Sequence, residues 1–380
     1  MRAVWLTHNY PRQPGDVAGA FLHPLAVALR ARGVDVRVIA PSDRGRGGDD
    51  MMDGVPIRRV RYARADDERY AYTGAMADAV KTPQGLRALA GLIRAMRAAA
   101  REEADGVREV VVHAHWWIPS GLAAPRELPM VLTCHGTDVR LLERSRPARW
   151  LGRTALRRAR VVTTVSAPFA ATLRARGGVR LGDDAIQPMP VVPIARPRST
   201  GGGGAVVLGR LTTQKRVGLA IEAWLTARAR GYTGGLTIVG DGPARAEVTA
   251  LAHARAPGQV VFVGAVPPSQ VPRWLQTADV LLMTAEGEGL GLVATEALMQ
   301  GVPVVACTDG GGVLDVVPAG GAGRVVAPSA EAIAEAMLAL AADTGAADAA
   351  YTLGQTWAAR LDPDAVAERA MGWYRRALGG

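Results

Sequence analysis

The chain has 380 residues, more than one ordinary hydrophobic core organises, so two domains are expected. Its composition, 49% hydrophobic and 21% charged, is that of a globular protein, and no run approaches the roughly 18 apolar residues of a membrane span. The net charge of +10 is uneven. Residues 1–190 carry 30 basic and 19 acidic side chains, a net of +11, whereas residues 191–380 carry 15 and 16, a net of −1.

Several classes of partner and compartment are excluded by what the chain lacks. It has no zinc finger, no RNA-recognition signature and no basic run with interleaved aromatics, so nucleic acid is not an expected partner. Cys134 and Cys307 lie far apart without metal-type spacing. The apolar part of the N-terminal MRAVWLTHNYPR is too short for a signal peptide. A cytoplasmic protein without disulfides is therefore expected.

In the first half, short β-branched runs alternate with helical stretches. Apolar residues recur on one face of 20–32, and Gly33 then predicts the end of a helix. Pro41 likewise predicts the end of a strand. Strands are predicted at 2–7, 35–40, 109–113, 129–134 and 160–165, and helices at 20–32, 84–104 and 147–159.

The second half repeats this rhythm after a segment that resembles a linker. Residues 186–204 contain four prolines and then four consecutive glycines, which favour a linker over packed structure. Further strands are predicted at 204–208, 235–239, 259–263, 279–283, 302–306 and 324–327, with helices between them. Strands that alternate with helices predict parallel sheets.

The predicted fold class is α/β, with two doubly wound, Rossmann-like domains that face an interdomain cleft. The expected domains are residues 1–190 and 200–363. The segment of about 364–380 looks helical and is expected to pack back on the first domain. Ligands of such sheets bind at the carboxyl ends of the strands, which directs attention to the segments that follow each strand.

Two cations follow the first strand of the second domain, in GRLTTQKR at 209–216. Arg210 and Lys215 lie between a strand and a helix, which suits a pyrophosphate site. Lys215 is one of only two lysines in the chain. The following motif, VGDGP at 239–243, is either a plain turn or a place where the backbone approaches a nucleotide. No GxGxxG fingerprint follows the first strand, which argues against a simple dinucleotide enzyme.

The first domain offers HAHWWIPSG at 113–121 and CHGTD at 134–138. His135 follows a strand and precedes a glycine, so its imidazole is a candidate for binding sugar hydroxyls or moving protons. The side chains of Trp116 and Trp117 either belong to the core or stack on the apolar face of a sugar.

The segment EGEGLGLVATEALMQGVPVVA, 286–306, carries Glu288 and Glu296 around a Gly-Leu-Gly turn. Sequence spacing does not establish the geometry of a glycosidase acid pair, and nearby Gly, Leu, Val and Ala offer no metal ligands. Two interpretations stay open from these residues alone. The glutamates either cap a helix and compensate its dipole or grip the diols of a nucleotide sugar. Glu286 is expected to face solvent or to act as a local cap.

Taken together, these motifs resemble retaining glycosyltransferases of family 4, also described as glycosyl transferases group 1, which have the GT-B fold. The pattern E-x7-E in EGLGLVATE is accompanied, in the family's order, by the motifs HWWIPSGLAA, CHGTDV, GRLTTQKRVGLAIEAW, IVGDGP, VFVGAVP, ADVLLMTAEGEGLG and GGGVLDVV. The resemblance spans nearly the whole chain.

The resemblance implies a site for a UDP- or GDP-linked sugar. Arg210 and Lys215 would bind the diphosphate, Glu288 the hydroxyls of the transferred sugar and Glu296 the ribose, while His135 would contact the sugar near the reacting carbon. We therefore expect Arg210, Lys215, Glu288 and His135 to be catalytic. The remaining residues expected to bind the sugar donor are Gly19, Gly240, Val263, Gly264, Gly289, Leu290, Gly291 and Leu292.

The acceptor is expected to be a hydroxyl of a small molecule, a glycan or a lipid-linked compound, bound by the first domain. The acceptor-binding candidates are Tyr10, Arg12, His23, Trp116, Trp117 and Asp138. Runs of arginine at 87–101 and 153–158 permit a peripheral contact with the cytoplasmic face of an anionic membrane, and equally permit solvated faces or a soluble phosphorylated acceptor.

The implied reaction retains the configuration at the anomeric carbon and requires positive charge on the leaving phosphate. No cofactor beyond the nucleotide-sugar co-substrate, and no metal, is then required. The Asp-x-Asp of Asp362-Pro-Asp364 is better interpreted as a helix cap. The alternatives are an inverting GT-B transferase, a nucleotide-sugar epimerase and a non-catalytic nucleotide-binding protein.

Four departures from the family's pattern weaken any inference about sugar identity and hinge contacts. The usual P-N-G-V-D near the linker is absent, and VVPIARP stands in its place. The first loop reads PGDVAGAF, so either Gly15 or Gly19 takes the place of the usual glycine pair. Asp315 stands where a glutamate is usual, and Leu290 where many relatives have an aromatic residue.

Overall fold

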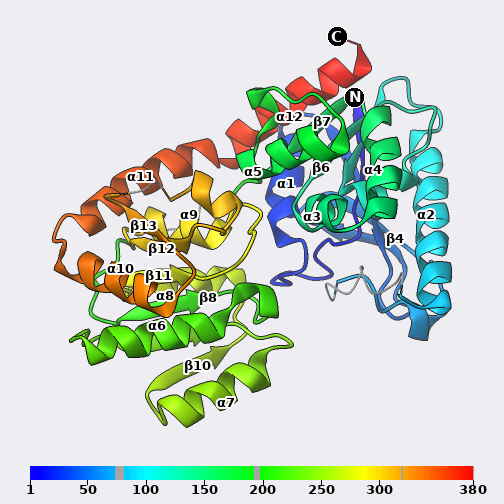
Figure 1. The fold of residues 1–380 in the computed structure, drawn as a ribbon. Coiled ribbons are helices and arrows are strands. Elements are labelled where there is room, and N and C mark those ends of the chain that lie inside the picture. Colours follow the sequence, from blue (N-terminus) through cyan, green and yellow to red (C-terminus); the bar gives the residue numbers. More distant parts are fainter. Residues whose placement is uncertain (73–80, 192–196, 318–319, 380) are drawn as a thin grey trace. The chain divides into compact units, whose positions relative to one another are not determined.

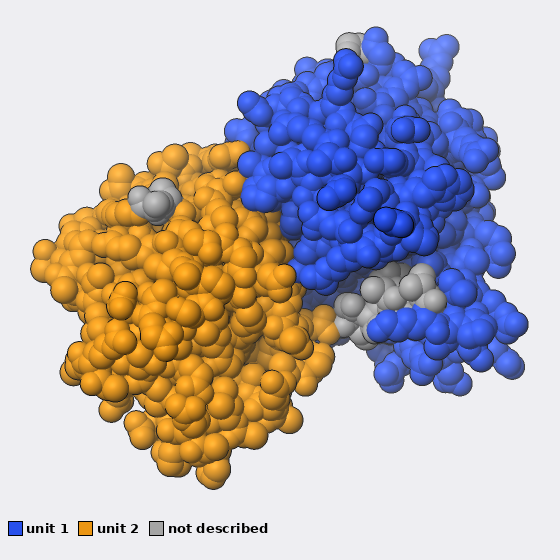
Figure 2. Space-filling model, in the orientation of Figure 1, with its two compact units in different colours: residues 1–192, 361–380 blue, residues 193–360 orange. Residues whose placement is uncertain are grey.

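The computed structural model describes residues 1–72, 81–191, 197–317 and 320–379. The chain forms two compact units, Met1–Val192 with Leu361–Gly380, and Pro193–Arg360 (Figures 1 and 2). Each unit contains an α/β fold whose sheet is wholly or mainly parallel, as the sequence predicted. Within the described residues, no helix is both long and apolar enough to cross a bilayer.

Unit 1 is built on a seven-stranded sheet of order β3-β4-β2-β1-β5-β6-β7, in which only the β3–β4 pair is antiparallel. Its strands are β1 Arg2–Leu6, β2 Asp35–Pro41, β3 Gly48–Met52, β4 Val55–Val60, β5 Val110–His115, β6 Met130–Cys134 and β7 Val161–Thr164. Its α-helices are α1 His23–Ala31, α2 Pro83–Ala104, α3 Thr137–Arg144, α4 Arg146–Arg158, α5 Ala167–Thr172 and α12 Pro363–Leu378.

The C-terminal helix α12 belongs to the core of unit 1 (Figure 1). Asp362 caps it by accepting hydrogen bonds from the backbone N–H groups of Asp364 and Ala365, which confirms the predicted helix cap. Trp373 and Tyr374 lie in the apolar cluster under the sheet, and the indole N–H of Trp5 donates to the Tyr374 hydroxyl at 2.9 Å. The last helix therefore stabilises the first unit.

Unit 2 carries an entirely parallel six-stranded sheet of order β10-β9-β8-β11-β12-β13. Its strands are β8 Ala205–Leu208, β9 Leu236–Val239, β10 Val260–Gly264, β11 Val280–Met283, β12 Val304–Cys307 and β13 Gly323–Val326. Its α-helices are α6 Val217–Ala229, α7 Arg245–Arg255, α8 Val271–Leu275, α9 Leu292–Met299, α10 Ala330–Ala342 and α11 Ala346–Arg360.

Both strand orders place a topological switch beside the first strand of each sheet. In unit 1 the chain runs outward from β1 to one side and restarts at β5 on the other, and in unit 2 the same occurs at β8 and β11. Connections diverge at such a point, which opens a crevice outside the carboxyl ends of the two strands. The segments after β1, β5, β8 and β11 are therefore the places to look for a site.

Candidate active site

At the switch point of unit 2, two of the predicted residues are in direct contact. Lys215 lies at the end of the loop that follows β8, and Glu288 lies in the loop that follows β11. The Lys215 Nζ is 2.6 Å from the Glu288 Oε1, and both side chains are largely shielded, at 23% and 13% exposed. The family resemblance implied neighbouring roles for these residues on one ligand, but their ion pair was not predicted.

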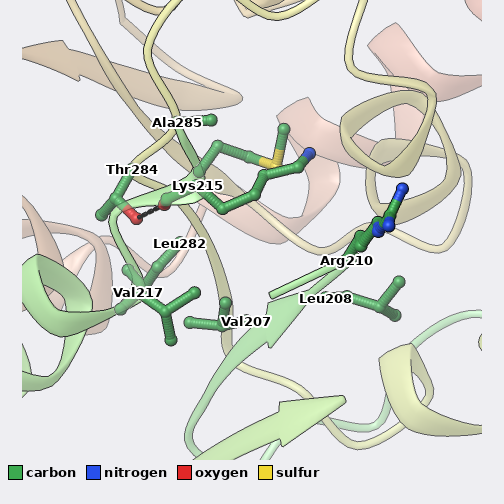
Figure 3. Close-up of a pocket in the computed structure, with 10 residues that line it drawn as sticks. Val207, Leu208, Arg210, Lys215, Val217, Leu282, Thr284 and Ala285 are labelled. Atoms are coloured by element: carbon green, nitrogen blue, oxygen red, sulfur yellow. Dashed lines mark hydrogen bonds between the residues drawn. The ribbon is translucent and has the colours of Figure 1, made fainter. Parts of the chain in front are cut away.

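Arg210 supplies a second cation at the same edge of the sheet. It is exposed, and it lines a shallow pocket with Lys215. Figure 3 shows the Arg210 and Lys215 side chains extending beyond the strands, away from the aliphatic floor of the pocket. That floor is formed by Val207, Leu208, Val217 and Leu282.

The loop that carries Lys215 is held by Arg216, a residue the sequence analysis did not single out. Its backbone is left-handed, with φ of 47°, and it begins α6. Its guanidinium forms two hydrogen bonds with the Asp309 carboxylate, at 2.7 and 2.6 Å, and a third with the Thr284 carbonyl at 2.7 Å. The Thr284 hydroxyl in turn donates to the Lys215 carbonyl at 2.8 Å (Figure 3).

The opposite charges of Arg216 and Asp309 stabilise each other. The hydrogen bond and charge of Arg216 lower the pKa of Asp309, and the Asp309 carboxylate raises the pKa of Arg216. Both groups therefore stay ionised over the ordinary pH range, and the loop after β8 is tied to the loops after β11 and β12. In the structure, Arg216 stands out by its positive φ, which is uncommon at a non-glycine residue. The sequence carries no signal of this backbone conformation.

Three consecutive glycines, 310–312, pack against the loop that carries Glu288. The Glu288 N–H donates to the Gly310 carbonyl at 2.8 Å, and the Gly312 N–H donates to the Glu288 carbonyl at 2.9 Å. A Cβ on Gly311 would lie 2.8 Å from the Glu288 carbonyl oxygen, so no side chain fits there. The motif GGGVLDVV thus supports the loop that presents Glu288.

Glu296 lies on α9, which begins just after Gly291. Gly291 is left-handed, with φ of 79°, and precedes the first residue of the helix. Glu296 is half-buried in the second turn, so the two glutamates of E-x7-E are separated by the helix start, as the sequence predicted. Leu290 is 5% exposed and packs inward. Glu286 is exposed, which confirms one of its two expected placements.

The motif VGDGP packs against the loop that follows β8. A Cβ on Gly240 would lie only 1.9 Å from the Gly209 carbonyl oxygen, and one on Gly242 would lie 2.3 Å from the Leu211 carbonyl oxygen. These glycines let the backbone approach the loop after β8. The Gly240 N–H also donates to the Gly264 carbonyl at 2.8 Å, which places Gly264 and Val263 at the end of the neighbouring strand.

In unit 1, His135 lies directly after β6, next to the end of β5, which borders the switch point. Its Nε2 is 3.0 Å from the His115 Nδ1, and its ring centroid is 4.4 Å from that of Trp116. Burial lowers the pKa of His135 well below its usual value. Its imidazole is therefore neutral at physiological pH. Trp116 has a φ of +69°, a strained conformation for an aromatic residue of the kind that clusters at functional sites.

Two of the acceptor candidates are structural in this fold. Trp117 is fully buried, and its indole N–H donates to the Asp138 carbonyl at 2.8 Å. The buried Asp138 carboxylate accepts the backbone N–H groups of Trp117, His135 and Gly136. Its oxygens are thus committed to the turn after β6. The sequence interpretation of Trp117 and Asp138 as acceptor-binding residues is corrected accordingly.

The candidates near the N-terminus are also engaged in local contacts. Tyr10 is fully buried, and its hydroxyl lies 2.7 Å from the His23 Nδ1, so it too is a structural residue rather than an acceptor contact. The His23 Nε2 lies 2.8 Å from the exposed Asp53 carboxylate. Arg12 pairs with two carboxylates, those of Asp16 and Asp43, each at 2.7 Å.

The loop after β1 also shows which of its two glycines is required by packing. Gly19 has a φ of 69°, and a Cβ there would lie 2.1 Å from the Asn9 carbonyl oxygen. Gly15 also has a positive φ, but nothing surrounds the place of its Cβ. Gly19 therefore closes the loop onto itself.

Comparisons with known proteins agree with this geometry. A family model described as "Glycosyl transferases group 1" matches residues 203–343, and one described as "Glycosyl transferase 4-like domain" matches residues 18–182. The putative teichuronic acid biosynthesis glycosyltransferase TuaC of Bacillus subtilis is 27% identical over 369 residues, which cover 89% of this chain and 88% of that relative.

Two solved structures show the same fold over nearly the full length. The sucrose-phosphate synthase of Thermosynechococcus elongatus aligns with a TM-score of 0.74 at 20% identity, covering 99% of this chain and 98% of the other. Anabaena Alr3699/HepE, solved with UDP and glucose, aligns with a TM-score of 0.71 at 16% identity, covering 98% of both chains.

The two parallel-sheet α/β units, with their strand orders, define a protein of the GT-B fold class. The two matching models together cover most of the chain, and their order along it is the one the motifs indicated. The chain belongs to the group 1 glycosyltransferases, and it is accordingly a glycosyltransferase.

Proposed function

We propose that this glycosyltransferase moves a sugar from a UDP- or GDP-linked donor to a hydroxyl acceptor, with retention of configuration at the anomeric carbon. The observation that carries the proposal is the convergence of Arg210, Lys215 and Glu288 outside the carboxyl ends of β8 and β11. Two cations suit a diphosphate, and a carboxylate beside them suits the hydroxyls of a sugar.

The proposed mechanism uses positive charge rather than a protein nucleophile. Arg210 and Lys215 stabilise the negative charge that develops on the departing nucleoside diphosphate, which is where such charge lowers the barrier most. Glu288 accepts hydrogen bonds from hydroxyls of the transferred sugar, the backbone N–H groups of residues 289–291 donate to the sugar's oxygens, and Glu296 accepts hydrogen bonds from the ribose hydroxyls. In unit 1, His135 contacts the transferred sugar. The acceptor hydroxyl attacks on the face from which the diphosphate leaves.

The relatives support a nucleotide-sugar donor without choosing its base. Anabaena Alr3699/HepE was solved with UDP and glucose. In this chain, the base is proposed to meet the backbone of Val263 and Gly264 at the end of β10, and Gly264 has an open left-handed backbone with φ of 87°.

A thermal-shift panel of UDP, GDP and their sugars tests donor binding. We expect one nucleotide series to raise the unfolding temperature, and Lys215→Ala and Glu296→Ala to reduce that shift strongly. Arg230→Ala is the matched control, because Arg230 pairs with Glu335 at the far end of α6. If no nucleotide changes the unfolding temperature of the unmodified chain, the proposal is wrong.

The stereochemistry is tested on the product. Once a donor and an acceptor are found, proton NMR of the glycosidic product gives its anomeric configuration, and we expect it to match that of the donor sugar. Inversion would instead assign the chain to an inverting GT-B transferase. Conversion of the nucleotide sugar without transfer would indicate an epimerase, and binding without turnover of any donor a non-catalytic binder.

Metal independence is part of the same proposal, because Arg210 and Lys215 supply the positive charge that a divalent ion would otherwise provide. We expect transfer to continue at an unchanged rate after dialysis against EDTA. A rate that falls with EDTA and recovers with Mg²⁺ or Mn²⁺ would contradict this.

We also propose that the protein binds its acceptor at an anionic membrane surface, and that the outer face of α4 contacts this membrane. Helical spacing puts Arg146, Trp150, Arg153 and Arg157 on one face, and the Trp150 side chain is 72% exposed. An exposed indole between arginines is typical of helices that lie in a membrane interface. Arg153 also donates to a backbone carbonyl of unit 1, that of Arg176 at 2.9 Å, as Arg97 and Arg158 do. The proposed membrane contact therefore depends chiefly on Arg146, Trp150 and Arg157.

Vesicle flotation tests this surface. We expect the protein to float with vesicles that contain anionic lipid, less at high salt, and to lose binding in Trp150→Ala. Leu86→Ala is the matched control, since Leu86 is another exposed apolar residue of unit 1, on α2. The absence of salt-sensitive association would refute the membrane contact and leave a soluble acceptor.

A further inference from the structure

His135 has one ring nitrogen already committed inside the protein. Its Nε2 lies 3.0 Å from the His115 Nδ1, and both residues are neutral because burial lowers each pKa well below the usual value. A neutral imidazole has one N–H and one acceptor nitrogen, so one partner must donate and the other accept. The direction of this bond decides whether His135 presents an N–H or a lone pair at its Nδ1.

The other nitrogen of His115 resolves the direction. The His115 Nε2 is buried and meets no hydrogen-bond partner among the described residues. If His115 carried its proton there, a buried N–H would be left without an acceptor, an arrangement that is costly and rare. With the proton on Nδ1 instead, His115 donates to His135, and only a lone pair is left unpaired. The His135 proton then lies on its Nδ1.

The His115 ring cannot easily turn to reverse this arrangement. It packs against the His113 ring at a centroid distance of 4.1 Å and against the Trp5 indole at 4.6 Å. His115 is fully buried on β5, the strand at the switch point of the sheet. Its orientation is therefore fixed by the core of unit 1.

His113, which packs against it, is itself held in a defined state. The indole N–H of Trp5 donates to the Tyr374 hydroxyl at 2.9 Å, and the His113 Nδ1 lies 2.9 Å from the same hydroxyl. The Tyr374 O–H donates to that nitrogen, because a buried O–H without an acceptor would be costly. His113 consequently carries its proton on Nε2 and donates to the Thr133 hydroxyl at 2.7 Å. This chain of hydrogen bonds continues from His113 to Thr133 and Thr163 and does not pass through His115, so the two histidines have separable roles.

We infer that His115 is a positioning residue that holds His135 in the Nδ1–H tautomer, so that His135 offers an N–H to an oxygen of the bound ligand. The identity of that ligand, the sugar donor with its hydroxyl and phosphate oxygens, rests on the proposed function. The tautomer of His135 does not depend on the proposed function, because it is a property of the folded chain alone. A neutral N–H at this place stabilises negative charge or a hydroxyl without being a strong acid.

Nitrogen-15 NMR of the protein labelled at histidine tests the tautomer directly. The chain contains only six histidines, so the ring signals can be assigned with single variants. We expect His135 to show the Nδ1–H form and His113 the Nε2–H form in the unmodified protein. An Nε2–H signal for His135 would overturn the inference, whether or not any sugar donor is ever turned over.

Two substitutions then separate positioning from packing. Asn at position 115 can place its amide N–H where the His115 Nδ1–H lies, whereas Leu of similar size cannot donate. We expect His115→Asn to keep the Nδ1–H form of His135 and a kcat within about threefold of the unmodified enzyme. In His115→Leu we expect mixed tautomers and a kcat lower by about 10- to 100-fold, with a smaller change in KM, because misplacement of one group costs rates of that order.

Tyr374→Phe is the matched control for disturbance of the buried cluster. It removes the hydroxyl that donates to His113 but leaves the bond between His115 and His135 intact. We expect a lower unfolding temperature, an unchanged His135 tautomer and a kcat within about threefold of the unmodified enzyme. If Tyr374→Phe lowers kcat as much as His115→Leu does, or if His115→Leu keeps both tautomer and rate, His115 is only a core residue.

Discussion

Lys215 and Glu288 carry opposite charges on loops that follow different strands, and their contact at 2.6 Å sets the charge of the proposed donor site. A diphosphate that binds Lys215 must share it with the Glu288 carboxylate, which repels the phosphate. On the proposed function, Glu288 opposes the binding of free nucleotide and favours a ligand whose sugar hydroxyls satisfy its oxygens.

Glu288→Gln is expected to separate these two effects, because it removes the charge and keeps the shape. The free nucleoside diphosphate should bind at least about 3- to 10-fold more tightly, since a unit charge a few ångströms away is worth about 1 kcal/mol even in bulk water and more in a partly shielded site. Sugar transfer should fall at the same time. Calorimetric titration with UDP and GDP gives the affinities, and the exposed Glu286→Gln is the control for a nonspecific charge effect. Weaker nucleotide binding in Glu288→Gln would contradict this account of the pair.

The buried histidines of unit 1 make its stability depend on pH. Burial lowers the pKa of His8 to about 4 and that of His113 to about 3, and it lowers those of His115 and His135 well below the usual value. An unfolded chain takes up these protons near pH 6.5, while the folded chain does not. Stability is therefore complete above pH 6.5 and is lost as the pH falls from 6.5 toward the folded values.

Each such histidine is expected to lower the free energy of unfolding by about 1.4 kcal/mol per pH unit within that window. Urea unfolding of the full chain between pH 7.5 and 5.5 measures the slope. Carboxylates with lowered pKa, such as Asp35 and Asp309, are ionised in both states over this range and do not contribute. Unfolding midpoints of unit 1 that stay constant down to pH 5.5 would show that the cluster is hydrated and titrates normally.

The loops after β8, β9, β11 and β12 stack on one another at the edge of the sheet in unit 2. Gly240 and Gly242, in the loop after β9, pack against the loop after β8, and Gly310–Gly312, in the loop after β12, pack against the loop after β11. At these places backbone packs on backbone, so a side chain would displace a neighbouring loop. The positions of Lys215 and Glu288 therefore depend on glycines in the supporting loops.

Gly240→Ala tests this dependence at the scale of a loop. The added Cβ would overlap the Gly209 carbonyl oxygen at 1.9 Å, and the φ of 141° is unfavourable for alanine. We expect a loss of about 3 kcal/mol or more of stability in unit 2 together with loss of nucleotide binding. Gly258→Ala is the control, because Gly258 also has a positive φ but nothing surrounds its Cβ, so only about 1–2 kcal/mol should be lost.

Thermal unfolding and nucleotide titration of both variants check this prediction. Equal losses in Gly240→Ala and Gly258→Ala would mean that backbone conformation alone matters and that the close approach to Gly209 does not.

The sequence predicted most of these elements because parallel strands are buried on both faces and appear as short apolar runs. It missed the hairpin of β3 and β4, since the edge strand GDDMM is exposed at its first four residues and has no apolar alternation. It also missed Arg216 and Asp309, whose pairing spans 93 positions and depends on the order of strands in the sheet. Motif spacing located Lys215 and Glu288 separately, but their contact is a product of the fold.

Trp117, Asp138 and Tyr10 were predicted to bind the acceptor, but the structure buries their side chains. Each lies in or beside a motif at the carboxyl end of a strand, where functional residues are expected, yet each is buried and serves the turn that it occupies. A sequence pattern marks such a turn without stating which of its side chains faces outward.

At the scale of the whole molecule, the chain leaves unit 1 after residue 191 and returns to it at residue 361. The two ends are adjacent, because the Val191 N–H donates to the Leu361 carbonyl at 3.1 Å. The returning segment brings α12, whose Trp373 and Tyr374 are 2% and 0% exposed in the core of unit 1. Truncating one buried aromatic side chain of this size typically costs about 3–5 kcal/mol, a large part of the stability of a domain.

Residues 1–191 alone are therefore expected not to fold into a stable domain, whereas 1–191 joined to 361–379 should fold. Because the ends are adjacent, a flexible Gly/Ser linker of about four to six residues suffices to connect them. The measurements are solubility, resistance to proteolysis and a cooperative thermal transition. The joined protein with Trp373→Ala is the control, and it should unfold at a lower temperature than the joined protein itself. If residues 1–191 alone unfold cooperatively at the same temperature as the joined protein, α12 only covers unit 1 and is not part of its core.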